Sequence, residues 1–468
     1  MIKRIILFLF ILLFAKTKSQ NFIALPYLDN GIGTGYLERV LFDSIHDKLI
    51  VSGKDMNYAG GKKVRGICSW NGNIWDSLRG GINTHDILSN QPNGVALCGI
   101  PYNGKFLVGG VFESIGGVNA SALATWDGSK WDSLPTRAFK FLDYGGIIYN
   151  FINFNSKFYL CGLFDTIQGV PANNLATYNG TSFQPVPIPI TSVGGITDMK
   201  VYNGDLYVSG VFSYSFQPSN RHILRFDGTN WYSVGGSVKG SISNIASMAI
   251  YNNELYVGGF FLKTDGNVAD IIMKWDGTTW KDVGWGSMYQ NGGIWKLLVY
   301  HSKLYAFGTF NKAANQKASK LAVFDGINWC TYPDSVSSDI MSATIYHDSI
   351  YIAGAFRTIA GDTAKKYIAK ITKVNNFNQC VNIGIKGYEN LNSGIIFYPN
   401  PVSNILFIST EQNEFENSEI EITNTLGQTV LKLHYSNEID VSELAQGVYN
   451  LRITTQNNHQ FHAKLIKQ

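Results

Sequence analysis

The chain has 468 residues, of which 45% are hydrophobic and 15% charged, with 48 glycines and a formal charge of +4. Glycine exceeds its usual ~7% share and charged residues fall below the ~25% norm, which suits a turn-rich extracellular β protein of two or three domains. Four basic residues lie in the first nineteen positions, and without them the formal charge is zero. This balance excludes the basic field that nucleic-acid binding requires.

Residues 1–19 have the pattern of a secretory signal peptide. Lys3 and Arg4 form a charged start, and Ile5–Ala15 is an apolar run that is too short to span a bilayer comfortably. Thr17 and Ser19 supply small residues for cleavage before Gln20. No later segment is apolar for eighteen residues, so we expect no integral membrane span in the mature chain.

Residues 20–375 consist of a repeat that is rich in strand signals. A glycine after a strand-like run recurs at intervals of 46 to 57 residues, at Gly53, Gly110, Gly162, Gly210, Gly259, Gly308 and Gly354. An aromatic residue after an Asp-Gly or Asn-Gly turn recurs at nearly the same intervals, at Trp75, Trp131, Phe183, Trp231, Trp280 and Trp329. Two anchors that move together indicate true repeats, and this period is typical of the blades of a β-propeller.

Each repeat predicts four short antiparallel strands joined by tight turns. The fourth unit shows the pattern in full, with runs at 199–202, 205–210, 223–226 and 231–234 and turns at Asn203-Gly204 and Asp227-Gly228. Four strands per unit are what one propeller blade contains.

The seventh repeat stops after its third strand, near Ile371. The start of the mature chain, Asn21–Leu25, is similar to the fourth-strand segment Asn73–Leu78. We therefore expect an all-β fold in which the N-terminal strand completes the last blade and closes a seven-bladed propeller. Closure would leave no free strand edge between the first and last blades.

The Gly-Gly after a strand, followed by an aromatic residue and a Trp that begins the outer strand, resembles the kelch repeat. The resemblance covers about residues 20–375 and implies a scaffold of the galactose oxidase-type propellers. A scaffold of this kind does not determine a function.

The repeat ends near Lys373, and residues 376–393 are Asn-rich and irregular, as in a linker. Residues 394–468 carry about seven short strand signals, which predict a small Ig-like β-sandwich.

Tyr-Pro-Asn-Pro at 398–401, Leu-Gly-Gln at 426–428 and Gly-Val-Tyr at 447–449 resemble the type A C-terminal sorting domain of the type IX secretion system. That family implies export of a folded cargo across the outer membrane, followed by release or attachment to surface lipopolysaccharide. The resemblance makes six residues structural and recognition residues: Pro399, Asn400, Pro401, Gly427, Gly447 and Tyr449. The prolines block strand pairing and the glycines permit turns, and both statements would also hold for an ordinary binding sandwich.

The search for chemistry yields no catalytic, metal-binding or cofactor-binding residues. Asp127, Asp227, Asp276 and Asp325 recur before a turn glycine, where other repeats have Asn71 and Asn179, so they are interpreted as turn residues. His46, His301 and His347 also fall in hairpin turns. Of the five cysteines, Cys330 and Cys380 are candidates for a disulfide, and whether they pair stays open.

Aromatic residues divide into two groups. The regularly spaced Trp residues are interpreted as packing between adjacent blades. Four irregular aromatics fall in the longer loops, which share one face of the ring, and are candidates for ligand contact: Tyr214, Phe216, Trp285 and Tyr289.

These features favour a non-enzymatic protein at the outer cell surface that binds a glycan or a surface protein and is exported by the type IX machinery. Two alternatives remain: a carbohydrate-active or oxidase-type enzyme on a propeller scaffold, and a structural surface component. The sequence does not give the ligand, the oligomeric state, or whether the protein is released or attached.

Overall fold

The structure is a computed structural model. It describes residues 21–25, 28–29, 36–54, 56–83, 94–134, 139–141, 144–190, 194–213, 221–240, 243–286, 292–314, 316–372, 395–398, 402–410, 418–424, 427–456 and 460–467. The predicted signal peptide, 1–19, and the predicted linker, 376–393, lie outside these residues. The chain divides into two compact units, Met1–Ile383 and Gly384–Gln468, and each is described by itself.

Within the described residues, the first unit contains eight four-stranded antiparallel sheets, and the seven that repeat one strand order are numbered here in chain order. Sheet 1 contains β3 (Arg39–Asp43), β4 (Lys48–Ser52), β7 (Ile67–Trp70) and β8 (Trp75–Asp76). Sheet 2 contains β10 (Val95–Tyr102), β11 (Lys105–Val111), β14 (Leu123–Trp126) and β15 (Trp131–Ser133). Sheet 3 contains β18 (Ile147–Phe154), β19 (Lys157–Leu163), β22 (Leu175–Tyr178) and β23 (Phe183–Pro185).

Sheets 4 to 7 repeat this order. Sheet 4 contains β24 (Ile196–Tyr202), β25 (Asp205–Ser213), β26 (Arg221–Phe226) and β27 (Trp231–Ser233). Sheet 5 contains β28 (Asn244–Tyr251), β29 (Glu254–Phe260), β30 (Ile272–Trp275) and β31 (Trp280–Asp282). Sheet 6 contains β32 (Ile294–Tyr300), β33 (Lys303–Gly308), β36 (Leu321–Phe324) and β37 (Trp329–Thr331). Sheet 7 contains β38 (Ile340–Ile345), β39 (Ile350–Gly354), β40 (Ile368–Ile371) and β1 (Phe22–Ala24).

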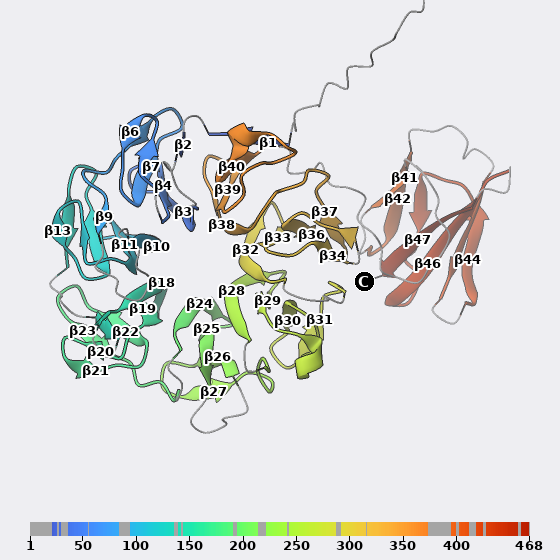
Figure 1. The fold of residues 1–468 in the computed structure, drawn as a ribbon. Helices are drawn as coiled ribbons and strands as arrows, with labels where there is room; N and C mark the ends of the chain where they lie inside the picture. Colours follow the sequence, from blue (N-terminus) through green and yellow to red (C-terminus); the bar gives the residue numbers. More distant parts are fainter. Residues whose placement is uncertain are drawn as a thin grey trace, which may run out of the picture. The chain divides into compact units, whose positions relative to one another are not determined.

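The seven sheets follow one another around a common centre, with the first strand of each sheet nearest to it (Figure 1). The first two strands meet in tight turns whose residues have positive φ, such as Asn203 (φ 49°) and Gly204 (φ 85°). The Asn-Gly hairpin signal is therefore confirmed. At the next turn, the Asp227 carboxylate accepts hydrogen bonds from the backbone N–H groups of Thr229 and Asn230, at 2.7 Å each. The recurring acid is thus a turn residue, as predicted.

The regularly spaced Trp residues join neighbouring sheets. In four sheets, the indole Nε1 donates a hydrogen bond of 2.8–3.0 Å to a backbone carbonyl of the preceding sheet: Trp131 to Leu78, Trp231 to Pro187, Trp280 to Val234 and Trp329 to Val283. Trp131 and Trp329 are also buried. The predicted role of these residues in packing between sheets is confirmed.

A second set of contacts repeats at the other end of the inner strands. A Tyr hydroxyl donates to a carbonyl in the hairpin turn of the following sheet, for Tyr202 to Asn253, Tyr251 to Ser302, Tyr300 to Asp348 and Tyr346 to Asp47. The last of these bonds joins sheet 7 to sheet 1. The His347 ring is also within hydrogen-bond distance of Asp47 between the same two sheets, with Nε2 and Oδ1 2.8 Å apart.

The N-terminal strand β1 is the outermost strand of sheet 7. It pairs antiparallel with β40, with Phe22 opposite Ile371 and Ala24 opposite Ala369. Phe22 is 2% exposed and its ring lies 5.8 Å from the ring of Tyr332 in sheet 6. Sheet 7 therefore combines strands from both ends of the first unit.

Several segments that the sequence predicts as long loops contain secondary structure. Short hairpins occur as β5 (Tyr58–Ala59) with β6 (Lys62–Lys63), β12 (Ser114–Ile115) with β13 (Val118–Asn119), β20 (Thr166–Ile167) with β21 (Val170–Pro171), and β34 (Lys312–Ala313) with β35 (Gln316–Lys317). Three of the four extend against β2 (Leu28–Asp29), β9 (Ile82–Asn83), or β16 (Phe139–Phe141) with β17 (Tyr144–Gly145). Two 3₁₀ turns, η1 (Lys263–Asp265) and η2 (Thr363–Lys365), occupy equivalent loops.

Two of these hairpins, β5–β6 and β12–β13, turn on glycine pairs. Gly60 and Gly61, like Gly116 and Gly117, have positive φ values that fit a two-residue turn. A Cβ on Gly116 would lie 2.3 Å from the Trp131 ring, so the glycine also admits the indole of the outer strand. These two glycine pairs therefore mark hairpins outside the seven numbered sheets.

The second unit has two antiparallel sheets in the described residues. One contains β41 (Ile395–Tyr398), β42 (Ile405–Thr410) and β45 (Glu438–Asp440). The other contains β43 (Glu419–Thr423), β44 (Thr429–His434), β46 (Gly447–Thr454) and β47 (Gln460–Lys467). Leu406 and Ile439 of the first sheet share a buried core with Ile420, Leu451 and Leu465 of the second, so the two sheets pack face to face. In the parts of both units that are described, no helix has the length and apolar character needed to cross a membrane.

Replacing Phe22 with alanine tests the contribution of β1. The substitution deletes a fully buried ring between sheets 6 and 7, and we expect the free energy of unfolding to fall by about 3–5 kcal/mol in urea denaturation. Ile23→Ala is the matched control, because Ile23 lies on the same strand but is 54% exposed. Equal stability of the two variants would contradict a structural role for β1.

Trp131→Ala tests the packing between sheets 1 and 2. It removes a buried indole and its hydrogen bond to Leu78, so we expect a loss of about 3–5 kcal/mol. Ile74→Ala, at a residue that is 61% exposed, serves as the control. A melting temperature that Trp131→Ala leaves unchanged would refute the packing role.

Candidate functional site

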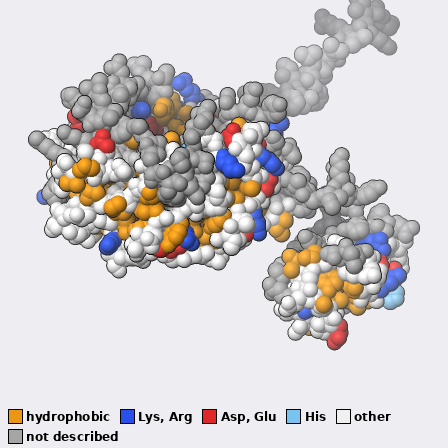
Figure 2. Space-filling view, turned by 90° about the horizontal axis from the view of Figure 1, so that it is seen from below, with side chains coloured by type: hydrophobic (Ala, Val, Ile, Leu, Met, Phe, Trp, Pro, Cys, Tyr) orange, Lys and Arg blue, Asp and Glu red, His pale blue; other side chains and the backbone are white. Residues whose placement is uncertain are grey.

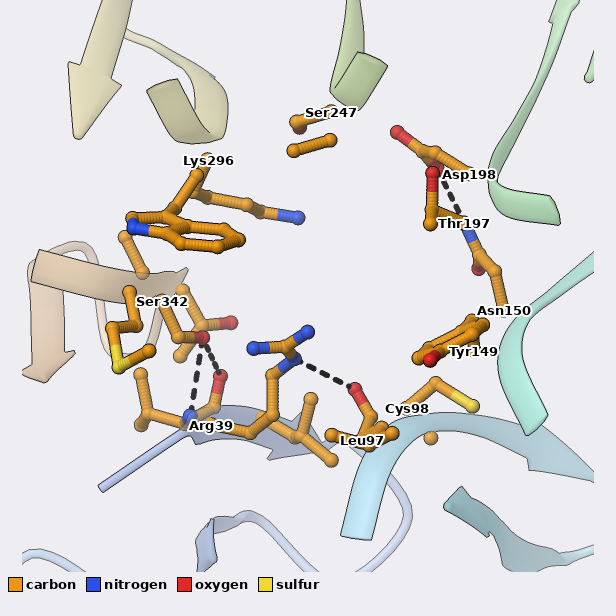
Figure 3. Close-up of a pocket in the computed structure, with 18 of the residues that line it drawn as sticks. Arg39, Leu97, Cys98, Tyr149, Asn150, Thr197, Asp198, Ser247, Lys296 and Ser342 are labelled. Atoms are coloured by element: carbon orange, nitrogen blue, oxygen red, sulfur yellow. Dashed lines mark hydrogen bonds between the residues drawn. The ribbon is translucent and has the colours of Figure 1, made fainter. Parts of the chain in front are cut away.

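A cavity of about 280 Å³ lies among the innermost strands of all seven sheets. Each of β3, β10, β18, β24, β28, β32 and β38 contributes lining residues. Figure 3 shows polar side chains that approach this space from different directions, including Arg39, Lys296, Asp198 and Tyr149. On the outer face of the first unit seen in Figure 2, by contrast, charged side chains are scattered rather than gathered into a field of one sign.

A repeated irregularity of the backbone positions the lining residues. In six of the seven inner strands, the pairing register shifts by one residue at the same point, between Ala96 and Cys98, Ile148 and Asn150, Ile196 and Asp198, Ile245 and Ser247, Ile294 and Lys296, and Ile340 and Ser342. A β-bulge of this kind bends the strand and changes the direction of the side chains around it.

The residue after each bulge occupies an equivalent place, opposite the residue that precedes the anchor glycine of the repeat. Arg39 has the same pairing in sheet 1, opposite Ser52. We call these seven residues the ring positions: Arg39, Cys98, Asn150, Asp198, Ser247, Lys296 and Ser342.

Three ring positions bind the next sheet in the same way. Asp198 Oδ2 accepts a hydrogen bond from the backbone N–H of Met248 at 2.6 Å. Ser247 Oγ accepts from Leu297 at 3.1 Å, and Ser342 Oγ accepts from Val40 at 3.2 Å. The last bond again joins sheet 7 to sheet 1. Short polar side chains at this register therefore connect the sheets around the cavity.

The Asp198 carboxylate has its bonding capacity filled by the protein. Besides Met248, it accepts hydrogen bonds from the backbone N–H of Met199 and the side-chain amide of Asn150. Lys200 Nζ lies 3.4 Å from Oδ1 of the same carboxylate. The negative charge of Asp198 is thus compensated within sheets 3 to 5.

Lys296 differs from the other ring positions. Its side chain extends into the cavity (Figure 3). Burial, together with the nearby positive charges of Lys200 and Arg39, lowers the pKa of its ammonium group to about 8 against the opposing attraction of Asp198. A cation in this environment is poorly compensated and would be stabilised by an anion.

Arg39 is the second cation of the cavity. Its Nε donates to the carbonyl oxygen of Leu97 at 3.2 Å, and Nη1 donates to that of Glu38 at 2.8 Å. These two bonds fix the guanidinium plane. Burial lowers the pKa of Arg39, but a guanidinium starts from so high a value that it keeps its charge at neutral pH.

The remaining lining residues are polar but neutral, or apolar. Burial raises the pKa of the Tyr149 hydroxyl, which keeps its proton at neutral pH. Burial likewise raises the pKa of the Cys98 thiol, so it is protonated and a poor nucleophile. Thr197 Oγ1 donates to the carbonyl of Ile245 at 2.7 Å, and Trp295 and Met341 add apolar surface. This combination suits the binding of a small anionic ligand.

The aromatic residues predicted to contact a ligand are not part of this cavity. Trp285 is 1% exposed and packs edge-on against Phe310 and Trp329, so its predicted role in ligand contact is wrong. The indole fills the space between sheets 5 and 6, in the same manner as the regularly spaced Trp residues. Tyr214, Phe216 and Tyr289 lie outside the described residues.

The predicted sorting residues have mixed outcomes. Gly427 has a φ of 80° and occupies a turn, as expected. Gly447 does not form a turn but begins β46, where it pairs with Lys467. The Tyr449 side chain is buried and its hydroxyl donates to the carbonyl of Ala445 at 2.7 Å. Pro399, Asn400 and Pro401 lie outside the described residues.

The other candidate residues for chemistry have structural surroundings. His222 is buried, and its ring nitrogens face the carbonyl oxygens of Gly210 and Gly240 at 3.0 and 3.2 Å. Cys330 is disulfide-bonded, and its predicted partner Cys380 lies outside the described residues. Across the residues that the structure describes, no cluster of three or more His, Cys, Asp or Glu side chains could hold a metal ion.

Sequence reasoning missed the ring positions, although a signal for them exists. Ile-Trp-Lys at 294–296, Ile-Thr-Asp at 196–198 and Ile-Ala-Ser at 245–247 place a polar residue two positions after an aliphatic one, at the same point of each repeat. When the first strands of the repeats are aligned, Lys296 and Arg39 stand at the position where the other repeats have shorter side chains. The candidate ligand contacts predicted from the sequence lie only in the long loops.

Comparison with known proteins identifies the end of the chain. Residues 396–468 match the family model of the secretion system C-terminal sorting domain. No curated protein matches the chain in sequence.

Three solved structures from B. thetaiotaomicron match over 96% of this chain. Two are extracellular domains of BT4673, described as a hybrid two component system and as a one component system, with TM-scores of 0.46 and 0.45 at 10% and 12% identity. The third is the extracellular domain of BT3049, described as a hybrid two component system, with a TM-score of 0.39 at 9% identity. The match covers 59%, 58% and 57% of those chains, respectively, so this chain spans about three fifths of their length.

The environment of Lys296 gives a pH-dependent stability. Because its folded pKa of about 8 lies below the unfolded value of about 10.4, the unfolded chain binds more protons between these values, and wild-type stability should rise there with pH. Lys296→Met removes this contribution. We expect the variant to be more stable than wild type at pH 7, by roughly 1–3 kcal/mol, and the difference to shrink between pH 8 and 10.

Urea denaturation at a series of pH values measures this difference. Lys157→Met, at an exposed lysine of β19, is the control. Its free energy of unfolding should differ from that of wild type by the same amount at every pH. A constant difference between Lys296→Met and wild type over the whole range would show that Lys296 is solvated like a surface lysine.

The family match assigns residues 396–468 a role in transport. A sorting domain of this kind interacts with the type IX secretion machinery, which recognises its cargo through that domain. The protein is therefore exported by the type IX system to the cell surface or into the surroundings.

Proposed function

We propose that the first unit is a seven-bladed, kelch-like β-propeller closed by β1, and that the exported protein acts as a non-enzymatic binding protein through the cavity at its centre. Support for the propeller comes from seven sheets of equal strand order and from the same inter-sheet bonds between sheets 7 and 1 as between other neighbours. β1 would supply the outer strand of the seventh blade.

One observation carries the binding function. At three ring positions a short polar side chain binds the next blade. Two other ring positions hold long cationic side chains instead, Arg39 and Lys296. Lys296 extends into the cavity instead (Figure 3). Arg39 and Lys296 are partly buried, and charges withdrawn from solvent are retained where something compensates them; a ligand supplies that compensation here.

Binding arrays of the mature protein, residues 20–468, test this proposal. We expect saturable binding to a component of a glycan, metabolite or surface-protein array. Ala246→Trp places an indole in the cavity and should abolish binding, because Ala246 is a lining residue. Leu262→Trp changes an exposed residue of a long loop and should leave binding intact.

The two variants separate the cavity from the loop face. Binding lost in Leu262→Trp and kept in Ala246→Trp would move the site to the long loops. Turnover of a bound compound, or a stoichiometric metal in the purified protein, would favour the enzyme alternative. An absence of any partner on all arrays would favour a structural surface component.

A further inference from the structure

We propose that the central cavity binds the carboxylate group of a small organic acid, about the size of a single sugar, between Lys296 and Arg39. This inference rests on the proposed binding function and specifies the chemistry of its ligand. It follows from the charge of the cavity, the fixed orientation of its donors and its volume.

The charge of the cavity determines the sign of the ligand. The groups that act electrostatically on Lys296 are Lys200, Asp198 and Arg39. Asp198 is matched by Lys200, with their charged atoms 3.4 Å apart. Glu38, which adjoins Arg39, is 3.7 Å from Lys54. Pairing these four charges leaves Arg39 and Lys296 as the excess, so an anion fits the cavity and a cation does not.

The Lys296 ammonium group is available to a ligand. It makes no hydrogen bond or ion pair to any residue that the structure describes, whereas Arg39 is held by the carbonyl oxygens of Leu97 and Glu38. A fixed guanidinium presents its remaining N–H groups in one plane, which suits a carboxylate, and the flexible lysine can close on it from another sheet.

The volume and the neutral lining determine the size and character of the rest of the ligand. A cavity of about 280 Å³ corresponds to about nine water molecules and lies at the lower limit of pockets for drug-sized ligands. Tyr149 and Thr197 present hydroxyl groups, and Trp295 presents an aromatic surface. Hydroxyl groups and apolar faces of a compact molecule match such walls, which favours an organic acid over an inorganic anion.

Calorimetric titration of the mature protein with matched pairs of ligands tests the proposal. The probes are D-glucuronate and D-galacturonate, their neutral counterparts D-glucose and D-galactose, the smaller acid lactate, and inorganic phosphate. We expect at least one organic acid to bind at least tenfold more tightly than its neutral counterpart and than phosphate. Equal affinity for a sugar acid and its parent sugar, or tightest binding of phosphate, would overturn the proposal, as would the absence of binding by every acid.

Variants of Lys296 locate the binding in the cavity. Lys296→Met should weaken the binding of the acid at least tenfold, Lys296→Arg should retain it within a few-fold, and Lys157→Met should leave it unchanged. Thermal melts of all variants establish that they fold. Binding of the acid that survives in a folded Lys296→Met would contradict the assigned site, and Arg39→Met offers an independent second test with the same expectation.

The affinity should also depend on pH. The acid should bind more weakly as the pH rises from 7 to 10, since Lys296 loses its proton over this range, and the dependence should flatten in Lys296→Arg. Tyr149 and Cys98 also line the cavity, but burial raises the pKa of each, so neither accounts for a change that begins near pH 8.

The outcomes distinguish this inference from the proposed function. If the arrays find a neutral ligand whose binding Ala246→Trp abolishes, the protein is a cavity-binding propeller and the carboxylate assignment alone fails. If neither the arrays nor the acids show binding, both fail.

Discussion

The pairing of β1 with β40 gives sheet 7 an outer strand from a part of the chain more than three hundred residues away. Neighbouring sheets are joined by outer-strand tryptophans in four cases, by tyrosines at the ends of inner strands in four cases, and by short polar side chains at three ring positions. Such contacts are individually modest, since a hydrogen bond contributes about 1 kcal/mol net. Because they recur from sheet to sheet, several such contacts together hold each pair of neighbouring sheets. β1 supplies the fourth strand that makes sheet 7 equivalent to the rest.

The same arrangement creates the cavity and determines its character. Seven inner strands that surround one centre cannot fill it completely with backbone, and their side chains decide what occupies the remaining space. The apolar positions of these strands face the neighbouring sheets, where residues such as Met199, Met248 and Leu297 are buried. The bulge redirects the ring positions, which are mostly polar. Short members satisfy backbone N–H groups of the next sheet, and Arg39 and Lys296 carry charge toward the centre.

Much of the fold could be predicted from the sequence, because its determinants are local. The hairpin turns, the Asp and Asn turn residues and the regular aromatic residues each carry a short-range signal that recurs along the repeats. The sorting domain was identifiable from Tyr398, Gly427 and Tyr449 and their neighbours for the same reason. Gly447 shows the limit of such reasoning, since a glycine in a family motif was expected to form a turn and lies in a strand.

The candidate site could not be predicted in the same way, because it is assembled from residues that are far apart in the chain. Arg39 and Lys296 have unremarkable local surroundings, and nothing near either residue indicates that the other lies across the same cavity. Trp285 was misassigned for a related reason: its position breaks the repeat, but the space between sheets 5 and 6 accepts an indole from an irregular segment as readily as from a regular one. Long-range packing, rather than local propensity, decides both cases.

The position of β1 in the chain also constrains the order of folding. Phe22 lies directly after the predicted signal peptide, while its partner Ile371 is close to the end of the first unit. β1 must therefore wait for nearly the whole first unit before it can pair, and a contact of such long sequence separation forms slowly. Until that pairing forms, sheet 7 lacks its outer strand and Phe22 lacks its buried position beside Tyr332.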